Sequence, residues 1–198
     1  MNLNLTQVKY IVTHHTATPF DTSVDSIKKG SLHWLSTNDR LKYFGMGYKC
    51  DYHWLIDQNG KVYQGQPETL QSFHSGNDEI NRQSVSICVV GNLQEYGMPI
   101  KQFTGLLQTL MIVHKRYPVS VLKHSMIVST ACPGANFPYE KLLKMMNIKD
   151  LNPASWNFKY MVPMLYFNQY SISEKINPDA PLTRAEYAVL KSKENKWV

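Results

Sequence analysis

Residues 8–14 read Val8-Lys9-Tyr10-Ile11-Val12-Thr13-His14, an alternation that is typical of a β-strand. Successive side chains of a strand point to opposite faces, so the pattern puts Val8, Tyr10, Val12 and His14 on one face and Ile11 on the other. A second histidine, His15, follows directly, and the same rule lets at most one of the two enter any single cluster of side chains. The segment therefore predicts a strand that carries one histidine to a candidate site at its end.

Further strands are predicted in two regions. Val85-Ser86-Ile87-Cys88-Val89-Val90 is too apolar for a half-exposed strand, which indicates a central, buried one. Residues 52–56 and 61–64 flank Asp57-Gln58-Asn59-Gly60, and an Asn-Gly dipeptide between alternating segments is a strong hairpin signal. In the first arm of this hairpin, the alternation predicts that Tyr52 shares a face with Trp54 and Ile56.

Helices are predicted between the strands. Ser23 or Asp25 is a candidate N-cap for a helix that runs towards Ser36. Thr104 is a candidate N-cap for the clearest helix, in which apolar residues recur at helical spacing before Pro118: Leu106, Leu110, Val113 and Tyr117.

A short strand over Val119–Leu122 and a helix over Tyr139–Met146 complete the pattern. Because strands alternate with helices, we expect an α/β or α+β domain in which helices cover a central sheet.

The chain has 198 residues, of which 43% are hydrophobic and 18% charged, as expected for one globular domain with an appendage. Asn152-Pro153 marks the expected boundary between a domain over residues 1–150 and a short, mostly helical extension over 151–198. The three cysteines are too few, and of the wrong parity, for a disulfide scaffold. The longest apolar stretches fall far short of the roughly 20 residues of a membrane span. The N-terminus lacks the features of a secretion signal, so we expect synthesis in the cytoplasm.

Basic residues concentrate in one segment. The net charge is +6, and residues 101–149 alone hold seven basic side chains against one acidic. Such a surplus indicates either an anionic partner on one side of the fold or lysines that keep a helix face soluble. No nucleic-acid-binding motif accompanies it, so we expect no nucleic-acid partner.

Two histidines and a cysteine form the candidate metal ligands. His14 ends the first strand, His124 follows the strand over Val119–Leu122, and Cys132 lies eight residues later in a loop closed by Pro133-Gly134. Side chains of these types hold zinc tetrahedrally and leave a fourth position for water, whose pKa zinc lowers to about 7. A histidine at a strand end also serves as an ordinary hydrogen-bonded residue, and the spacing alone leaves both interpretations open.

Three blocks in the same order carry a family resemblance. They are Ile11-Val12-Thr13-His14-His15-Thr16-Ala17, Asp51-Tyr52-His53-Trp54-Leu55-Ile56, and His124-Ser125 with Ser129-Thr130-Ala131-Cys132-Pro133-Gly134. His74-Ser75-Gly76 and residues 81–87 match as well. These blocks resemble the zinc-dependent N-acetylmuramoyl-L-alanine amidases, which share their fold with the peptidoglycan recognition proteins and include phage endolysins. The resemblance covers residues 6–146 and implies a mixed sheet of about five to six strands flanked by helices.

The resemblance also implies roles for individual residues. His14, His124 and Cys132 match the ligands of one zinc ion, and Tyr52 matches a catalytic tyrosine. Thr130 stands where the family carries lysine or threonine, so a neutral hydroxyl donor replaces a full positive charge. Four residues match positions that border the substrate cleft: His15, Thr16, His74 and Asn81.

The implied activity is hydrolysis of the amide bond between N-acetylmuramic acid and the L-alanine of bacterial peptidoglycan. The expected protein is a monomeric phage endolysin, which reaches the wall after a holin releases it, and the basic segment is expected to meet anionic wall polymers. A cytoplasmic muropeptide-recycling amidase and a non-catalytic peptidoglycan-recognition module remain as alternatives. In the extension, residues 177–188 resemble half of an S-layer homology motif, and a helix that packs on the amidase domain is the alternative.

Overall fold

The computed structural model describes residues 7–33, 35–148 and 151–167 of the chain. Five strands form one sheet in the order β3-β2-β4-β1-β5. β1 pairs in parallel with β4 and β5, β2 pairs in parallel with β4, and β2 and β3 form an antiparallel hairpin. The strands are β1 (Tyr10–His15), β2 (Trp54–Ile56), β3 (Val62–Gln64), β4 (Ser84–Val89) and β5 (Ser120–Lys123). The prediction of a mixed sheet is confirmed.

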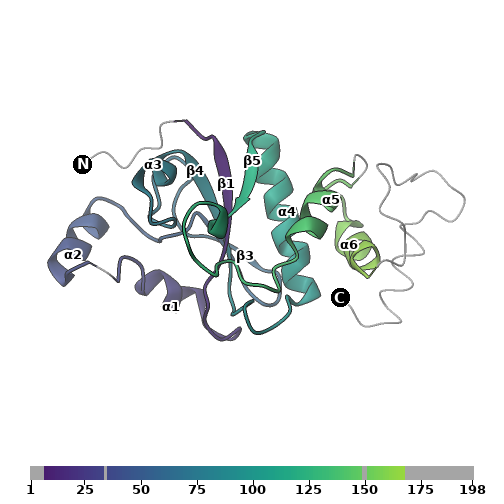
Figure 1. Ribbon diagram of the computed structural model, residues 1–198, viewed down its shortest axis with the longest axis horizontal. Helices are drawn as coiled ribbons and strands as arrows, with labels where there is room; N and C mark the ends of the chain where they lie inside the picture. The colour runs from purple at the N-terminus through teal and green to yellow at the C-terminus, as the bar shows by residue number, and fades with distance from the viewer. Residues whose placement is uncertain (1–6, 34, 149–150, 168–198) are drawn as a thin grey trace, which may run out of the picture.

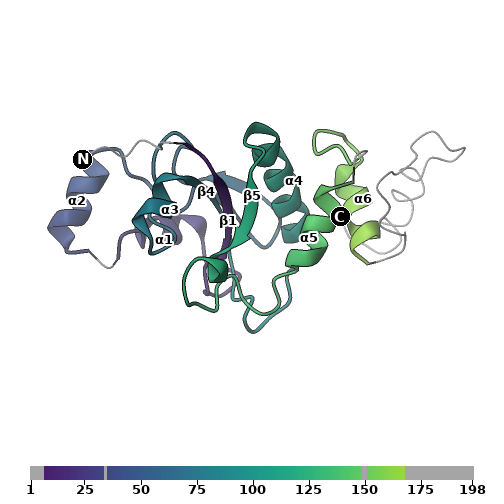
Figure 2. The same cartoon turned by 45° about the horizontal axis from the view of Figure 1, so that its top comes forward.

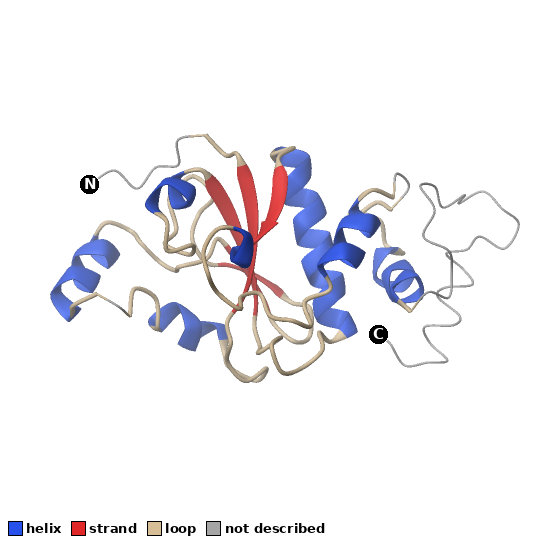
Figure 3. Cartoon of the chain, in the orientation of Figure 1, coloured by secondary structure: helices blue, strands red, loops and turns tan. Residues whose placement is uncertain are grey.

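Helices lie on both sides of the sheet, as Figure 3 shows. They are α1 (Val24–Lys29), α2 (Thr37–Gly45), α3 (Asp78–Arg82), α4 (Ile100–Arg116), the 3₁₀ turn η1 (His124–Met126), α5 (Tyr139–Met146) and α6 (Phe158–Tyr166). In Figure 1, α1, α2 and α3 lie on one side of the strands, and α4 lies on the other with α5 and α6 beyond it. Figure 2 keeps this order, with α4 between the sheet and α6. No described helix is long and apolar enough to cross a membrane.

The face of the sheet under α4 is the main hydrophobic core. Alternate residues of β4 point into it, and α4 supplies Leu106, Leu110 and Val113, all essentially inaccessible to solvent. The spacing of these three residues puts them on one stripe of the helix, as the sequence predicts. Full burial of each such side chain stabilises the fold by about 1.5–3 kcal/mol, so this face supplies most of the stability.

The opposite face has a mixed character. Near α1 it carries a small apolar cluster that includes Leu55 and Cys88. Near the start of β4 this face is polar, because Ser84 and Ser86 alternate with the apolar residues of that strand. Both serines form hydrogen bonds to buried histidines. His14 of β1 points to this face, where its ring contacts those of Tyr52 and His74. The polar half of this face holds the candidate site.

Two of the predicted helices have different bounds in the structure. The helix capped by Ser23 ends at Lys29, and a second helix begins after Ser36, whose hydroxyl accepts a hydrogen bond from the Asp39 amide. Between them Leu32 adopts a positive φ of 59°, where its amide donates to both carboxylate oxygens of Asp51. A buried carboxylate thus interrupts the predicted single helix, a tertiary contact that the local sequence does not reveal.

The long helix α4 begins earlier than predicted. It starts at Ile100, directly after Pro99, and the hydroxyl of Thr104 donates to the Ile100 carbonyl instead of capping the helix. Pro99 is the N-cap, and its carbonyl accepts a hydrogen bond from the Phe103 amide at 2.9 Å. The strand β1 likewise extends one residue further, to His15.

The first part of the C-terminal extension packs on α4. Phe158, Val162 and Leu165 of α6 belong to the main hydrophobic cluster, and the Gln108 side chain donates a hydrogen bond to the Pro153 carbonyl at 2.8 Å. Residues 151–167 therefore share the core of the preceding domain. The segment that resembles an S-layer homology motif lies outside the described residues.

Candidate metal centre

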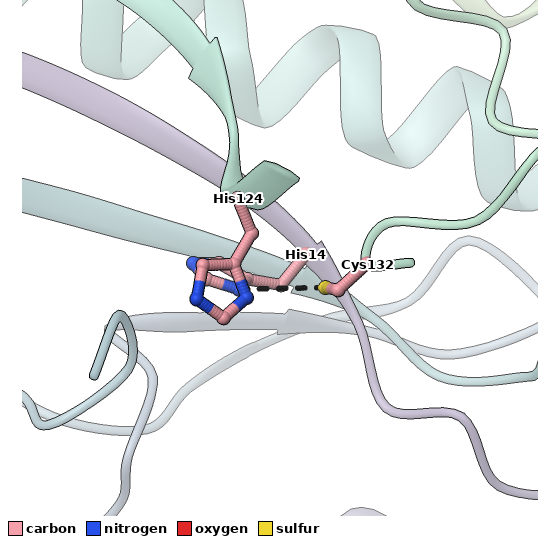
Figure 4. Close-up of side chains that lie close together, drawn as sticks. All are labelled: His14, His124 and Cys132. Carbon is pink, nitrogen blue, oxygen red and sulfur yellow. Dashed lines mark hydrogen bonds between the residues drawn. The ribbon is translucent and has the colours of Figure 1, made fainter. Parts of the chain in front are cut away.

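His14, His124 and Cys132 converge from three separate parts of the chain. His14 lies at the end of β1, and His124 is the first residue of η1, directly after the neighbouring strand β5. Cys132 lies in the following loop. One candidate ligand atom from each residue lies within 4.8 Å of the other two. The Cys132 Sγ is 3.6 Å from the His14 Nδ1, and Figure 4 shows the three side chains pointing toward one another.

The donor atoms suit a zinc ion. Tetrahedral Zn²⁺ with nitrogen ligands at about 2.0–2.1 Å and sulfur at about 2.3 Å places its ligand atoms about 3.3–3.8 Å apart. The Sγ–Nδ1 distance of 3.6 Å falls in this range. Imidazole nitrogens with one thiolate are also among the ligand sets that zinc favours. The three side chains present here therefore fit the group that the sequence predicts.

The second ring nitrogen of each histidine is held by the protein. His14 Nε2 lies 2.9 Å from His74 Nδ1, and His124 Nε2 lies 3.1 Å from the Ser75 carbonyl oxygen. Hydrogen bonding of one ring nitrogen fixes which nitrogen is left for a metal. In both histidines that remaining atom is Nδ1.

Burial sets the protonation states of these groups. Burial lowers the pKa of His14 well below its ordinary value, and the neighbouring rings of His74 and His124 lower it further. The imidazole is therefore neutral, as a metal ligand must be. Burial raises the pKa of the Cys132 thiol to about 11, partly offset by the His15 backbone amide, which donates to Sγ at 3.4 Å.

Tyr52 lies beside His14. The two ring centroids are 5.4 Å apart with an interplanar angle of 52°. Burial raises the pKa of the Tyr52 phenol well above its ordinary value, so its hydroxyl keeps its proton. The expectation that Tyr52 shares a face with Trp54 and Ile56 is wrong: Tyr52 precedes β2 and packs with the cluster of Leu55 on the opposite face. This irregular start of the strand turns the phenol toward the candidate metal ligands.

Thr130 lies in the same loop as Cys132 and is exposed. Its Oγ1 accepts a hydrogen bond from the Cys132 backbone amide at 3.2 Å. That bond uses a lone pair and not the hydroxyl proton. Thr130 can therefore help to hold the loop and still donate a hydrogen bond.

The residues expected to border a substrate cleft occupy different surroundings. Thr16 lines a cavity of about 270 Å³ together with Tyr52, Asp51 and residues of α1. The ring of His15 is turned elsewhere, and its Nδ1 accepts a hydrogen bond from the Leu93 amide. His74 and Asn81 line a second cavity of about 420 Å³, yet both are buried. Both ring nitrogens of His74 and the Oδ1 of Asn81 form hydrogen bonds within the protein.

Sequence reasoning gave no role to Ser75 or Ser84, although both touch histidines at the site. Ser75 acts through its backbone carbonyl, which no residue pattern reveals. A usable signal existed for Ser84, because small hydroxyl residues at alternate positions of an otherwise apolar strand mark a polar patch on one face.

Fold and site together define a class: an α/β domain in which two histidines at the ends of the neighbouring strands β1 and β5 meet a loop cysteine, with a tyrosine beside them. Such a group is suited to metal-assisted hydrolysis. The comparisons agree with this class. The family model described as N-acetylmuramoyl-L-alanine amidase matches residues 4–135. The chain therefore belongs to the N-acetylmuramoyl-L-alanine amidase family. No curated protein sequence matches it.

Several solved structures are similar over most of their length. The N-acetylmuramoyl-L-alanine amidase LysC from Clostridium intestinale URNW is 25% identical, with a TM-score of 0.59 over 72% of this chain and 87% of its own. The Ph2119 endolysin from the Thermus scotoductus MAT2119 bacteriophage is 26% identical, with a TM-score of 0.58 over 72% and 87% of the two chains. Drosophila peptidoglycan recognition protein SD, at 22% identity and a TM-score of 0.53 over 71% and 82%, shares the fold.

Proposed function

We propose that this chain is a zinc-dependent enzyme that hydrolyses the amide bond between N-acetylmuramic acid and the L-alanine of the peptidoglycan stem peptide. One observation carries the proposal: in a member of the amidase family, His14, His124 and Cys132 bring their ligand atoms within 4.8 Å of one another. Tyr52 and Thr130, which lie beside these ligands, complete the proposed catalytic residues.

A zinc ion held by these three side chains would polarise the scissile carbonyl and acidify a water molecule. The chain's own residues then bind and orient the reacting groups. The Tyr52 phenol, kept protonated by burial, donates a hydrogen bond toward the carbonyl oxygen as negative charge develops on it. Thr130 offers a second, neutral hydrogen-bond donor. Tyr52 and the metal would therefore stabilise more of the developing negative charge than they do in relatives with a lysine at this position.

Substrate binding is proposed on the Tyr52 side of the centre. The cavity that Thr16 lines with Tyr52 is also lined by Thr18, Thr22 and Ser26. Hydroxyl groups that both donate and accept suit the amides of a stem peptide or the hydroxyls of a sugar. Thr16 is thus the expected substrate-binding residue that the cavity supports best.

We further propose that the protein acts as an endolysin on the intact wall. Two of the similar structures, at 25–26% identity, are described as an amidase of Clostridium and a phage endolysin, and this chain spans 87% of each. The basic residues of 101–149 are proposed to contact anionic polymers of that wall, because opposite charges raise the rate of encounter.

The experiment measures zinc content and bond cleavage together. The purified full chain is expected to hold one zinc ion and to release stem peptides with a new L-alanine N-terminus from peptidoglycan, and to lose both on chelation. Cys132→Ser removes a ligand, and Cys50→Ala removes a different buried thiol as the matched control. Equal cleavage by wild type, Cys132→Ser and the chelated protein contradicts the proposal. Tight peptidoglycan binding without cleavage by the zinc-loaded wild type favours a recognition module instead.

A further inference from the structure

One short segment, His74–Ser75, contacts both candidate histidine ligands. The ring of His74 hydrogen-bonds to His14, and the carbonyl of the next residue, Ser75, hydrogen-bonds to His124. The two ligands come from β1 and η1, which are over 100 residues apart in the chain. Two adjacent residues of a third segment therefore hydrogen-bond to Nε2 of both imidazoles.

The direction of these hydrogen bonds follows from what each group can donate. The Ser75 carbonyl oxygen only accepts, so His124 Nε2 carries the hydrogen of that bond. A neutral imidazole has one N–H, which leaves a lone pair on His124 Nδ1. This nitrogen can face a metal.

The same reasoning fixes His14 through a chain of three bonds. The Ser84 hydroxyl donates its only hydrogen to the Ile80 carbonyl at 2.6 Å, so it accepts from His74 Nε2 at 2.9 Å. His74 then accepts at Nδ1, and His14 donates to it from Nε2 at 2.9 Å. The lone pair of His14 is left on Nδ1, the atom 3.6 Å from the Cys132 sulfur.

Asn81 holds the segment in place. Its Oδ1 accepts from the backbone amides of His74 and Ser75, at 3.2 and 2.9 Å, and its side chain is only 4% exposed as part of α3. A single side chain thus binds the backbone amides of both residues of the segment. Removal of Asn81 would leave the backbone amides of His74 and Ser75 without this acceptor.

We infer that the His74–Ser75 segment, anchored by Asn81 and Ser84, is a positioning element that presents Nδ1 of both His14 and His124 to the metal. His74 and Asn81, expected from the sequence to border the substrate cleft, are thereby assigned to hold the ligands. The inference rests on the proposed zinc site. It predicts a loss of metal affinity, and not primarily of substrate binding, when the segment is disturbed.

The test compares Ser84→Ala and His74→Ala with Ser86→Ala. Ser86 lies on the same strand and face as Ser84 and bonds to His53 instead of to the metal centre, which makes it a matched control. Competition with a chromophoric zinc chelator is expected to show affinity about 10- to 100-fold weaker in the first two variants and unchanged in Ser86→Ala. KM for a soluble muropeptide is expected to stay within about twofold once zinc is saturating.

A second measurement does not depend on the variants folding. Long-range ¹H–¹⁵N NMR of the wild-type chain, both metal-free and zinc-loaded, is expected to show His14 and His124 protonated at Nε2. Protonation at Nδ1 in either ring overturns the inference, as does a Ser84→Ala affinity equal to that of Ser86→Ala. If wild type binds no zinc, the proposed function fails while the metal-free spectrum still decides the inference. If wild type binds zinc and the variants match the control, only the inference fails.

Discussion

The two faces of the central sheet are built from the same strands and differ in purpose. Under α4, residues such as Ile87 and Val89 pack against Leu106 and Leu110 with no polar atom among their side chains. On the opposite face, alternate residues of the same strand are serines that hydrogen-bond to buried histidines. Period-two alternation thus lets one strand stabilise the domain on one side and build a site on the other.

The face under α4 is expected to provide stability, and the opposite face is expected to provide the metal site. Substitutions under α4 are expected to change the free energy of unfolding and leave metal affinity alone. Substitutions on the opposite face are expected to do the reverse. Five predictions follow, from the largest expected effect to the smallest, and the first three test this division.

Cys132→Ser tests the site face most severely. Because a serine hydroxyl is a poor zinc ligand, kcat/KM is expected to fall by about 10³-fold or more. The free energy of unfolding of the metal-free protein is expected to change by less than about 1 kcal/mol, since Cys132 lies outside the main core. Urea denaturation with chelator present, beside a peptidoglycan cleavage assay, measures both quantities. A large loss of stability in the metal-free variant would contradict the division.

Leu110→Ala is the converse substitution, on the α4 face. Leu110 is completely buried in the main cluster, so the cavity left behind is expected to cost about 3 kcal/mol of unfolding free energy. Zinc affinity and kcat, measured well below the melting temperature, are expected to stay within about twofold of wild type. Loss of zinc from the folded variant would show that the two faces are coupled.

Tyr52→Phe removes one hydroxyl and keeps the ring that packs beside His14. If the phenol stabilises the developing charge, kcat is expected to fall by about 10²-fold while zinc affinity stays unchanged. Steady-state kinetics with a soluble muropeptide, together with zinc content, separates the two effects. Unaltered kcat would leave Tyr52 with a packing role only.

Asp51→Asn concerns a buried carboxylate next to Tyr52 in the chain. Burial raises the pKa of Asp51 from 3.8 to about 6, although Tyr48 and the Leu32 amide donate to it. A raised carboxyl pKa means that the folded state prefers the protonated form. The stability that this preference contributes is fully present below pH 4 and is lost as pH rises through 6, by up to about 3 kcal/mol.

The asparagine variant lacks this titration and keeps an acceptor oxygen. Wild type is therefore expected to lose stability relative to Asp51→Asn as the pH increases from 4 to 7. Urea denaturation of the metal-free proteins at each pH measures it. Parallel stability curves for the two proteins across this range would refute the assignment.

Charge reversal in the basic segment is expected to give the smallest effect. Arg116 pairs with Glu68, and Lys141 donates to the Tyr166 carbonyl, so both are engaged within the protein. Lys115 and Lys144 are exposed. The double variant Lys115→Glu/Lys144→Glu is expected to slow lysis of whole walls by about threefold at low salt and to spare a soluble muropeptide.

The matched control reverses two exposed lysines outside the segment, Lys9 and Lys42, for the same change in net charge. Turbidity decrease of wall suspensions at several salt concentrations measures the effect. If both double variants slow lysis equally, or neither slows it, the lysines of the basic segment serve solubility and not wall binding.

Much of this architecture was predictable from local pattern. The alternation around Tyr10–His15, the apolar run of β4 and the helical stripe of α4 each follow from the period of the element they form. The helix break near Leu32 was not predictable, because the carboxylate of Asp51 that binds its amide lies 19 residues away. Long-range contacts of this kind leave no trace in the spacing of neighbouring residues.

The candidate site divides in the same way. Residue types and family motifs indicated His14, His124 and Cys132, which the structure brings together. The support behind them was not predictable, since the Ser75 carbonyl belongs to the backbone and the bonds of His74 depend on how two strands and a loop meet.

We predict that the polar face of the sheet holds zinc. Anomalous scattering at the zinc K edge from crystals of the full chain tests it most directly. We predict a single strong anomalous peak, at bonding distance from Nδ1 of His14, Nδ1 of His124 and Sγ of Cys132. The absence of zinc from protein purified and crystallised with the metal, or a peak bonded to other side chains, would contradict the account.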